Sequence, residues 1–127
     1  MLRNDHTAFR VRDLDRALDF YTGILGMRFL FRETDEAHGE AFAYLELEGG
    51  NLELLQSLDG AMPPVAEPRP PYTPHLAIAT DDLVALATVL GEKHVPILKG
   101  PMTIPGKVTW LYIADPDNNV LEFVQWL

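Results

Sequence analysis

Apolar positions along the chain switch between strand spacing and helix spacing, and they do so in the same order twice. In the first half, this pattern predicts a helix between the first two of four strands. The strands are expected at residues 5–11, 27–32, 41–48 and 52–56, the helix at 13–25, and a polar loop at 33–40. Asp13 is a suitable N-cap for that helix and Gly26 a suitable end. The first half is therefore predicted to be β-α-β-β-β.

The second half repeats this order. We expect strands at residues 75–80, near 97–98, at 108–114 and at 120–126, and a helix at 82–91. Residues 115–119 read as the turn of a closing hairpin, because Asp, Pro and Asn favour turn conformations. A second β-α-β-β-β module is predicted.

A Pro-rich segment, residues 58–74, separates the two halves. It holds six of the ten prolines, which cannot continue a helix or a central strand. The modules are therefore placed at 1–57 and 75–127, with 58–74 as their linker. Because 127 residues supply one good core but hardly two, we interpret residues 1–127 as a single α+β domain.

A shift of 69 positions superposes the two modules. It pairs His6 with His75 and Glu53 with Glu122. Neighbouring residues match at the same shift: Ala8 with Ala77, Asp13-Leu14 with Asp82-Leu83, Leu52 with Leu121, and Gln56 with Gln125. Several matches in one register indicate a true duplication.

The repeated His and Glu residues suggest metal chemistry. Two imidazoles and two carboxylates suit Zn, Ni, Co, Mn or Fe(II), and the same groups are the usual general bases. Cysteine is absent, so a metal would be held by His, carboxylate or water. His38 and His94 have no repeat partner and are interpreted as solvated side chains.

Glu53 and Glu122 lie in apolar runs, which predicts strands buried on both faces. A carboxylate there is costly unless it is paired, hydrogen-bonded or coordinated to a metal. The alternative for each Glu alone is an edge-strand residue facing solvent. For each His alone, the alternative is a surface or structural residue.

The net charge of −9 and the scattered Lys and Arg residues make nucleic acid an unexpected partner. No apolar run approaches the length of a membrane span, and residues 1–9 do not read as a signal peptide. We therefore expect a soluble, cytoplasmic protein that does not bind membranes.

Motifs along the chain resemble the vicinal oxygen chelate superfamily, and within it the glyoxalase I (lactoylglutathione lyase) family. In the first module they are His6-Thr7-Ala8-Phe9-Arg10-Val11, Asp13-Leu14, Asp19-Phe20-Tyr21-Thr22 and Leu25-Gly26-Met27. In the second they are Pro74-His75-Leu76-Ala77, Gly100-Pro101, and Asp115-Pro116-Asp117 before Leu121-Glu122. The resemblance implies paired βαβββ modules that form a curved mixed-sheet cup.

The resemblance also implies a metal and a reaction. One divalent ion (Ni, Co or Zn foremost, Mn or Fe as alternatives) would be held by His6, Glu53, His75 and Glu122. The implied substrate is the hemithioacetal of a 2-oxoaldehyde and glutathione, rearranged by proton transfer through a metal-stabilised ene-diolate. Glu122 matches the catalytic base, and Glu53 is the carboxylate opposite it. The family further implies a homodimer, in which a site can draw on both chains.

Two residues are candidates for substrate binding. Arg10 matches the Arg that holds the glutamyl carboxylate of glutathione in the family, although Ser57 replaces the Asn that assists it. The basic loop that closes on the glycyl carboxylate is replaced by residues 102–107, which leaves Lys107 as the candidate.

Other members of the superfamily provide the alternatives. Its extradiol dioxygenases and fosfomycin-modifying transferases use two His and one Glu, its epimerases resemble this pattern with Gln in place of Glu53, and its bleomycin-binding members lack the metal set. Retention of Glu53 favours the isomerase. The remaining alternatives are an epimerase or dioxygenase, or a resistance or sensor protein that only binds a small molecule.

Overall fold

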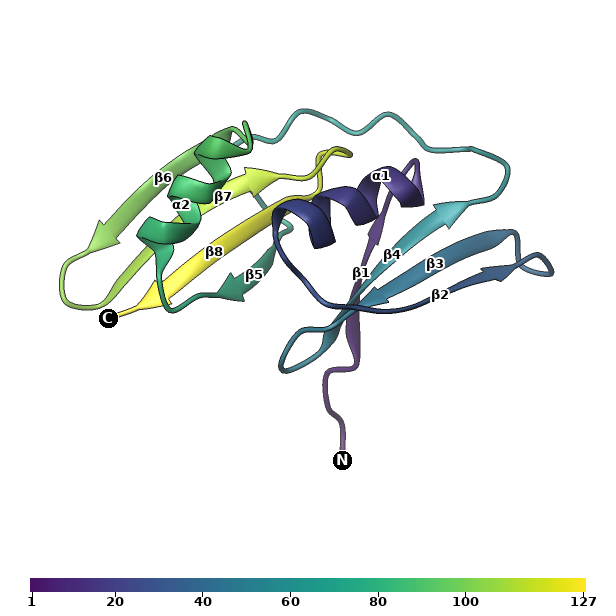
Figure 1. Cartoon of the computed structure of the whole chain (residues 1–127), viewed down its shortest axis with the longest axis horizontal. Coiled ribbons are helices and arrows are strands. Elements are labelled where there is room, and N and C mark those ends of the chain that lie inside the picture. The colour runs from purple at the N-terminus through teal and green to yellow at the C-terminus, as the bar shows by residue number, and fades with distance from the viewer. The chain divides into compact units, whose positions relative to one another are not determined.

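The structure is a computed structural model that describes residues 1–127, and it divides into two compact units, Met1–Val65 and Ala66–Leu127. We call them the first unit and the second unit. Figure 1 shows that each has its own sheet and its own helical segment. The division falls within the Pro-rich segment 58–74. That both modules make one domain stays a prediction.

The first unit is a four-stranded mixed sheet with the order β1-β4-β3-β2. Its strands are β1 (His6–Arg10), β2 (Phe29–Asp35), β3 (Glu40–Leu45) and β4 (Asn51–Ser57). β1 runs parallel to β4, and the other neighbours are antiparallel. The helical segment between β1 and β2 is α1 (Leu14–Leu18), which continues as a π-helical turn, η1 (Asp19–Ile24).

The second unit has the equivalent order β5-β8-β7-β6. Its elements are β5 (Leu76–Ala79), α2 (Leu83–Glu92), β6 (Ile97–Ile104), β7 (Val108–Ala114) and β8 (Val120–Trp126). Again the first strand is parallel to the last and the others are antiparallel. The predicted α+β class with two βαβββ modules is confirmed.

Several predicted bounds differ from the structure: the strand expected at 41–48 ends at Leu45, and the last part of the helix expected at 13–25 is π-helical. Two further differences concern β2 and β6. The loop expected at 33–40 is confined to residues 36–39, because β2 and β3 remain paired up to Asp35 and Glu40. The short strand near 97–98 is the eight-residue β6, whose register shifts beside Gly100. Both strands carry mostly exposed residues, which lack the apolar alternation that reveals a half-buried strand.

Each sheet turns one face toward its own helix. α1 contacts β3 and β4, and α2 contacts β8. The fully buried apolar side chains of the first unit include Leu14, Tyr21, Leu45, Leu52 and Leu54, and those of the second include Leu83, Leu90, Leu111, Ile113 and Leu121. Burying such side chains is the main favourable term in folding. The opposite face of each sheet carries the side chain of Glu53 in the first unit and that of Glu122 in the second.

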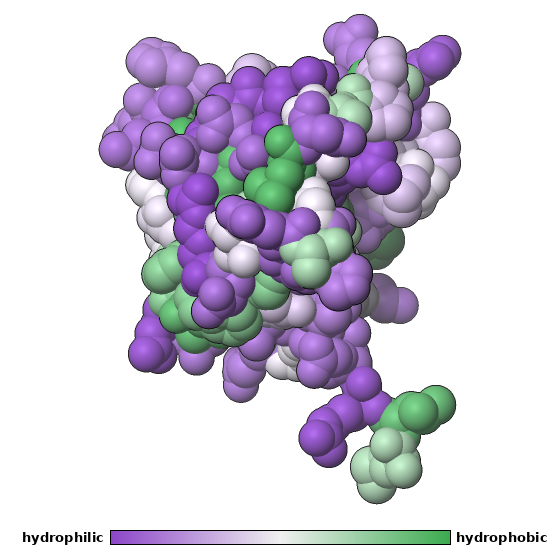
Figure 2. All heavy atoms as spheres, turned by 90° about the vertical axis from the view of Figure 1, so that its right-hand side faces the viewer, coloured by the Kyte–Doolittle hydropathy of each residue, from purple (hydrophilic) through white to green (hydrophobic).

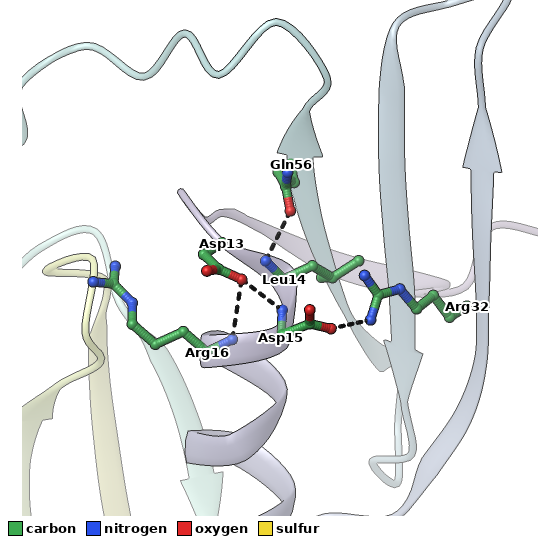
Figure 3. A network of polar contacts seen from close by, with 6 residues as sticks. All are labelled: Asp13, Leu14, Asp15, Arg16, Arg32 and Gln56. Atoms are coloured by element: carbon green, nitrogen blue, oxygen red, sulfur yellow. Dashed lines mark hydrogen bonds and ion pairs between the residues drawn. The ribbon is translucent and has the colours of Figure 1, made fainter.

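The helices begin in the same way in both units. Asp13 caps α1, and the side-chain oxygen of Gln56 in β4 accepts a hydrogen bond from the Leu14 N–H at 2.8 Å (Figure 3). In the second unit, the Gln125 side chain in β8 accepts from the Leu83 N–H at 2.9 Å. The match of Gln56 with Gln125 in the sequence repeat thus corresponds to a contact that both units make, between the last strand and the helix N-terminus.

No helix of the protein is long and apolar enough to cross a membrane. The face drawn in Figure 2 is mainly hydrophilic, with its hydrophobic atoms in separate patches. Exposed aromatic residues of the first unit include Phe29 and Phe31 on β2.

Candidate metal centre

In the first unit, the pairing of β1 with β4 brings His6 and Glu53 together. Ala8 is the register partner of Glu53, and His6 lies two residues before Ala8 on the same face of the strand. The His6 Nε2 atom is 3.5 Å from Glu53 Oε1. The Glu53 side chain is 12% exposed, so this carboxylate has lost most of its water.

In the second unit, β5 and β8 do the same for His75 and Glu122. Ala77 is the register partner of Glu122, and His75 immediately precedes β5. The His75 Nε2 atom is 2.8 Å from Glu122 Oε2, and the two side chains are 20% and 17% exposed. The repeat therefore produces the same His–Glu contact twice.

The other ring nitrogen of each His has a partner of its own. His6 Nδ1 lies 2.6 Å from Asp5 Oδ2, and His75 Nδ1 lies 2.9 Å from the backbone oxygen of Tyr72. A carbonyl oxygen only accepts, so Nδ1 of His75 carries the hydrogen. In a neutral ring, Nε2 then presents its lone pair to Glu122. Partners of this kind orient metal-binding histidines in known sites.

A lone pair that faces a carboxylate oxygen is repelled by it unless a positive charge lies between them or on the ring. A second ring proton or a metal ion supplies that charge. Two ligand atoms bonded to one ion at about 2.1 Å are roughly 3.0 Å apart in octahedral geometry and roughly 3.4 Å apart in tetrahedral geometry. The observed 2.8 and 3.5 Å fit two ligands of one ion. The donor sets are therefore suited to a divalent metal.

Neither unit assembles a full ligand set alone. No group of three or more His, Asp or Glu side chains capable of holding a metal forms within either unit. That His6, Glu53, His75 and Glu122 bind one ion together stays a prediction.

The two Glu residues differ in how far they are enclosed. Leu52 and Leu54 are fully buried, but Glu53 points to the opposite face, where Leu55 is partly exposed. Glu122 is also partly exposed. The expectation of burial on both faces is thus confirmed at Glu53, which is buried, and is wrong at Glu122, which is partly exposed. Residues near the predicted sites are accessible to a small molecule.

A tyrosine accompanies each pair, and sequence reasoning missed both. Tyr44 of β3 is the register partner of Glu53, and Tyr112 of β7 is the partner of Glu122. Each tyrosine ring centre is 5.4 Å from the ring centre of its His in an edge-to-face arrangement. The tyrosines are 68 positions apart, one fewer than the repeat shift, so the self-comparison of the sequence does not align them.

The two tyrosines differ in their hydrogen bonds. Burial raises the pKa of Tyr44, and the charge of Glu53 and a hydrogen bond to it raise the pKa further. Burial also raises the pKa of Tyr112, with a second contribution from the Glu122 charge. The Tyr112 oxygen, however, bonds the side chain of Trp110, whose indole can only donate. The Tyr44 hydroxyl therefore donates a hydrogen bond to Glu53, whereas the Tyr112 oxygen accepts one from the Trp110 indole.

Arg10 lines a hollow of about 590 Å³ in the first unit. The other lining groups include Ala8, His38 and Ser57. By strand alternation Ala8 and Arg10 share the face of His6, and Arg10 lies four residues, or about 13 Å, along β1. His38 is exposed, with Nδ1 2.8 Å from Asp35 Oδ2. The hollow therefore adjoins the His6–Glu53 pair without including it.

Lys107 is exposed in the turn between β6 and β7. It lies five residues before Tyr112, about 16 Å along an extended chain. Its role in binding substrate stays a prediction. Lys99 lies nearer the second pair, because it is the register partner of Tyr112.

Comparisons with known proteins agree with this arrangement. The chain is 30% identical over 127 residues to the uncharacterized protein YwbC of Bacillus subtilis, covering 97% of each chain. It is 29% identical over 125 residues to a probable lactoylglutathione lyase of Vibrio cholerae, covering 94% of this chain and 88% of that one.

Solved structures share the fold. A trypanothione-dependent glyoxalase I from Leishmania major has a TM-score of 0.78 at 26% identity, covering 98% of this chain and 87% of that one. The antibiotic-binding protein TnmS3 from Streptomyces has a TM-score of 0.76 at 23% identity, covering 100% and 98%, which shows the fold alone. The family model described as Glyoxalase/Bleomycin resistance protein/Dioxygenase superfamily matches residues 3–123. The chain belongs to this superfamily, the vicinal oxygen chelate superfamily that its motifs resemble.

Proposed function

We propose that the protein is a metal-dependent isomerase of the glyoxalase I type, a lactoylglutathione lyase-like enzyme acting on the hemithioacetal of a 2-oxoaldehyde. The observation that carries the proposal is the repeated His–Glu contact, with Nε2-to-carboxylate distances of 3.5 and 2.8 Å. Lactoylglutathione lyases among the relatives, at 27–29% identity, support the reaction class.

The ion would be held by His6, Glu53, His75 and Glu122, with Ni, Co or Zn as the first candidates. A bound divalent ion polarises the neighbouring oxygens of the substrate and makes its C–H bond more acidic. Because each unit provides only two of these ligands, the set combines both units, taken from one chain or from two chains of a homodimer. We place the enzyme in the cytoplasm.

Glu122 is proposed as the base that takes the proton from one substrate carbon and returns it to the next. Glu53 accepts a hydrogen bond from Tyr44, which holds its carboxylate in place. Glu122 affects its own tyrosine, Tyr112, through its charge, without a hydrogen bond between the two side chains. A carboxylate without a tyrosine hydrogen bond is better suited to move a proton. Glu53 is the fixed carboxylate opposite it.

The hollow around Arg10 is proposed to receive the thiol-derived part of the substrate. A guanidinium group pairs well with a carboxylate, which a glutathione adduct carries at its glutamyl end. Ser57 and His38 line the same space and offer further polar contacts. Lys107 is retained as the candidate for a second carboxylate.

Rate measurements with methylglyoxal and glutathione test the proposal. The wild-type protein should convert the hemithioacetal only after loading with Ni, Co or Zn. Glu122→Gln should lower kcat at least about 100-fold, the lower end for loss of a general base, while circular dichroism stays unchanged. Glu48→Gln, an exposed Glu in the β3–β4 loop, is the matched control and should retain full activity.

Full activity in Glu122→Gln would contradict its role. No activity in the metal-loaded wild type would favour the alternatives, an epimerase or dioxygenase of the superfamily. A protein that takes up no metal would instead favour a binding protein of the resistance or sensor type.

A further inference from the structure

A second hollow, of about 210 Å³, lies wholly within the second unit, and three aromatic side chains are among its lining residues. Its walls include the rings of Tyr72, Trp110 and Tyr112, together with Met102 and Lys99. Aromatic rings and a methionine sulfur offer flat, polarizable surfaces that favour another ring. A hollow of this size accommodates a small ring system rather than a whole peptide.

The rings are held in position before any ligand arrives. Tyr72 and Tyr112 have ring centres 5.0 Å apart and planes inclined by 30°. The Trp110 side chain is hydrogen-bonded to Tyr112, and Met102 is the register partner of Trp110 across β6 and β7. A preorganised aromatic wall loses little side-chain freedom on binding.

The backbone at Tyr72 is also unusual. Its φ of 60° lies in the left-handed region, which is uncommon for a bulky residue. Strained conformations of this kind concentrate at ligand sites. Here the strained residue lines the hollow, with its ring against that of Tyr112.

Lys99 gives the hollow its charge. No carboxylate lies within ion-pair distance of its ammonium group. In a chain with a net charge of −9, an ammonium group on an aromatic hollow is a local positive site. Aromatic rings alone would also attract a cation, but a neighbouring Lys repels one.

We propose that this hollow binds a planar aromatic group with an attached carboxylate or other anionic substituent. The ring would stack on the wall formed by Tyr72, Trp110 and Tyr112, and the anion would meet Lys99. Tyr112 also contacts the His75 ring, so the bound group would lie beside the candidate metal pair. If the proposed function holds, a 2-oxoaldehyde that carries an anionic aryl group should be a better substrate than methylglyoxal. The binding itself does not depend on that function.

NMR titration of metal-free protein with 2-naphthoate tests the proposal without relying on metal or turnover. The chain has two Trp residues, so the indole N–H signal of Trp110 reports on the hollow and that of Trp126 is an internal reference. We expect a saturable shift at Trp110. Binding should be roughly threefold to tenfold weaker for 2-naphthalenemethanol and for (2-naphthylmethyl)trimethylammonium, which lack the anion.

Variants separate the ring contact from the charge. Tyr72→Asn removes the ring with a residue that tolerates the left-handed backbone, and should weaken 2-naphthoate about tenfold. Lys99→Gln should abolish the preference for the acid over the alcohol, whereas Lys93→Gln, at the exposed end of α2, should keep it. The proposal is overturned by 2-naphthoate binding that is absent, that is unchanged in Tyr72→Asn, or that is matched by the ammonium probe. An inactive enzyme that still binds 2-naphthoate would reject the proposed function and leave this site standing.

Discussion

The Nε2 atom of His75 lies 2.8 Å from a carboxylate oxygen of Glu122, while the Nδ1 atom of the same ring lies 2.9 Å from the Tyr72 carbonyl oxygen. That second contact assigns the ring hydrogen to Nδ1 and directs the Nε2 lone pair at the carboxylate. His6 and Glu53 form the same contact at 3.5 Å. In each unit, therefore, a His nitrogen and a Glu oxygen face each other, and a cation bound to both would stabilise the pair.

The hydrogen bond from Tyr44 to Glu53 predicts a difference between two otherwise similar variants. Tyr44→Phe should weaken metal binding about tenfold, because loss of an outer partner loosens the ligand it holds. Tyr112→Phe should change metal affinity less, because Tyr112 makes no hydrogen bond to Glu122. Calorimetric titration with Zn²⁺ measures both affinities. A larger loss in Tyr112→Phe than in Tyr44→Phe would contradict the assignment of Glu53 as the anchored ligand.

The environment of Tyr44 also predicts how the stability of the folded protein falls at alkaline pH. Burial and Glu53 raise the pKa of Tyr44, so the folded metal-free protein binds the phenol proton more tightly than the unfolded chain. This contribution is complete below about pH 10, the ordinary pKa of tyrosine, and is lost as the pH rises through the folded pKa. Glu53→Gln should lower the pKa of Tyr44 but leave the effect of burial. Ultraviolet titration of tyrosinate, with Tyr44→Phe to assign the signal, measures the shift. An unchanged titration in Glu53→Gln would contradict the contact.

The glutamine contacts at the helix N-termini predict a stability loss. Gln125→Leu should reduce the free energy of unfolding by about 1–3 kcal/mol, because it leaves polar groups at Leu83 and Asp81 without their partner. Val84→Ala on the exposed face of the same helix is the control, expected to change it by less than about 0.5 kcal/mol. Urea unfolding compares them. Equal stabilities would show that the glutamine does not support the helix.

Substitutions at two glycines with a positive φ distinguish the cost of steric crowding from the cost of backbone strain. A Cβ at Gly100 would lie 2.8 Å from the Trp110 backbone oxygen and 3.0 Å from Leu111 Cα, whereas one at Gly106 would meet nothing within 4 Å. Gly106→Ala should cost about 1–2 kcal/mol from backbone strain alone. Gly100→Ala should cost about 2 kcal/mol more, because main-chain atoms cannot move aside easily. Thermal unfolding measures both, and similar losses would contradict the close approach of β6 to β7.

The elements that sequence predicts best are those with one buried face. β7 and β8 begin and end at the predicted residues 108–114 and 120–126, because both are largely apolar segments on either side of the turn at 115–119. The repeat also predicted that Gln56 and Gln125 correspond, and both make the same bond to a helix N-terminus. β2 and β6 were predicted too short because most of their side chains are exposed.

The residues of the candidate metal site could be predicted from the sequence only where the repeat marked them. His6 and Glu53, and likewise His75 and Glu122, were singled out by their common spacing and do approach each other within their units. Tyr44 and Tyr112 were hidden, because their partnership depends on the register between β3 and β4 and between β7 and β8. Tyr72 was hidden in a Pro-rich segment that has no periodic pattern to place its ring.

Binding of a divalent ion tests the central claim most directly. Calorimetric titration of metal-free protein with Ni²⁺ should give one ion per chain. His6→Asn and His75→Asn should each weaken binding at least about tenfold, since each removes a ligand, and the exposed His94→Asn should bind like wild type. The account is contradicted if the wild type takes up no ion, or if the ion binds equally well in His6→Asn and His75→Asn.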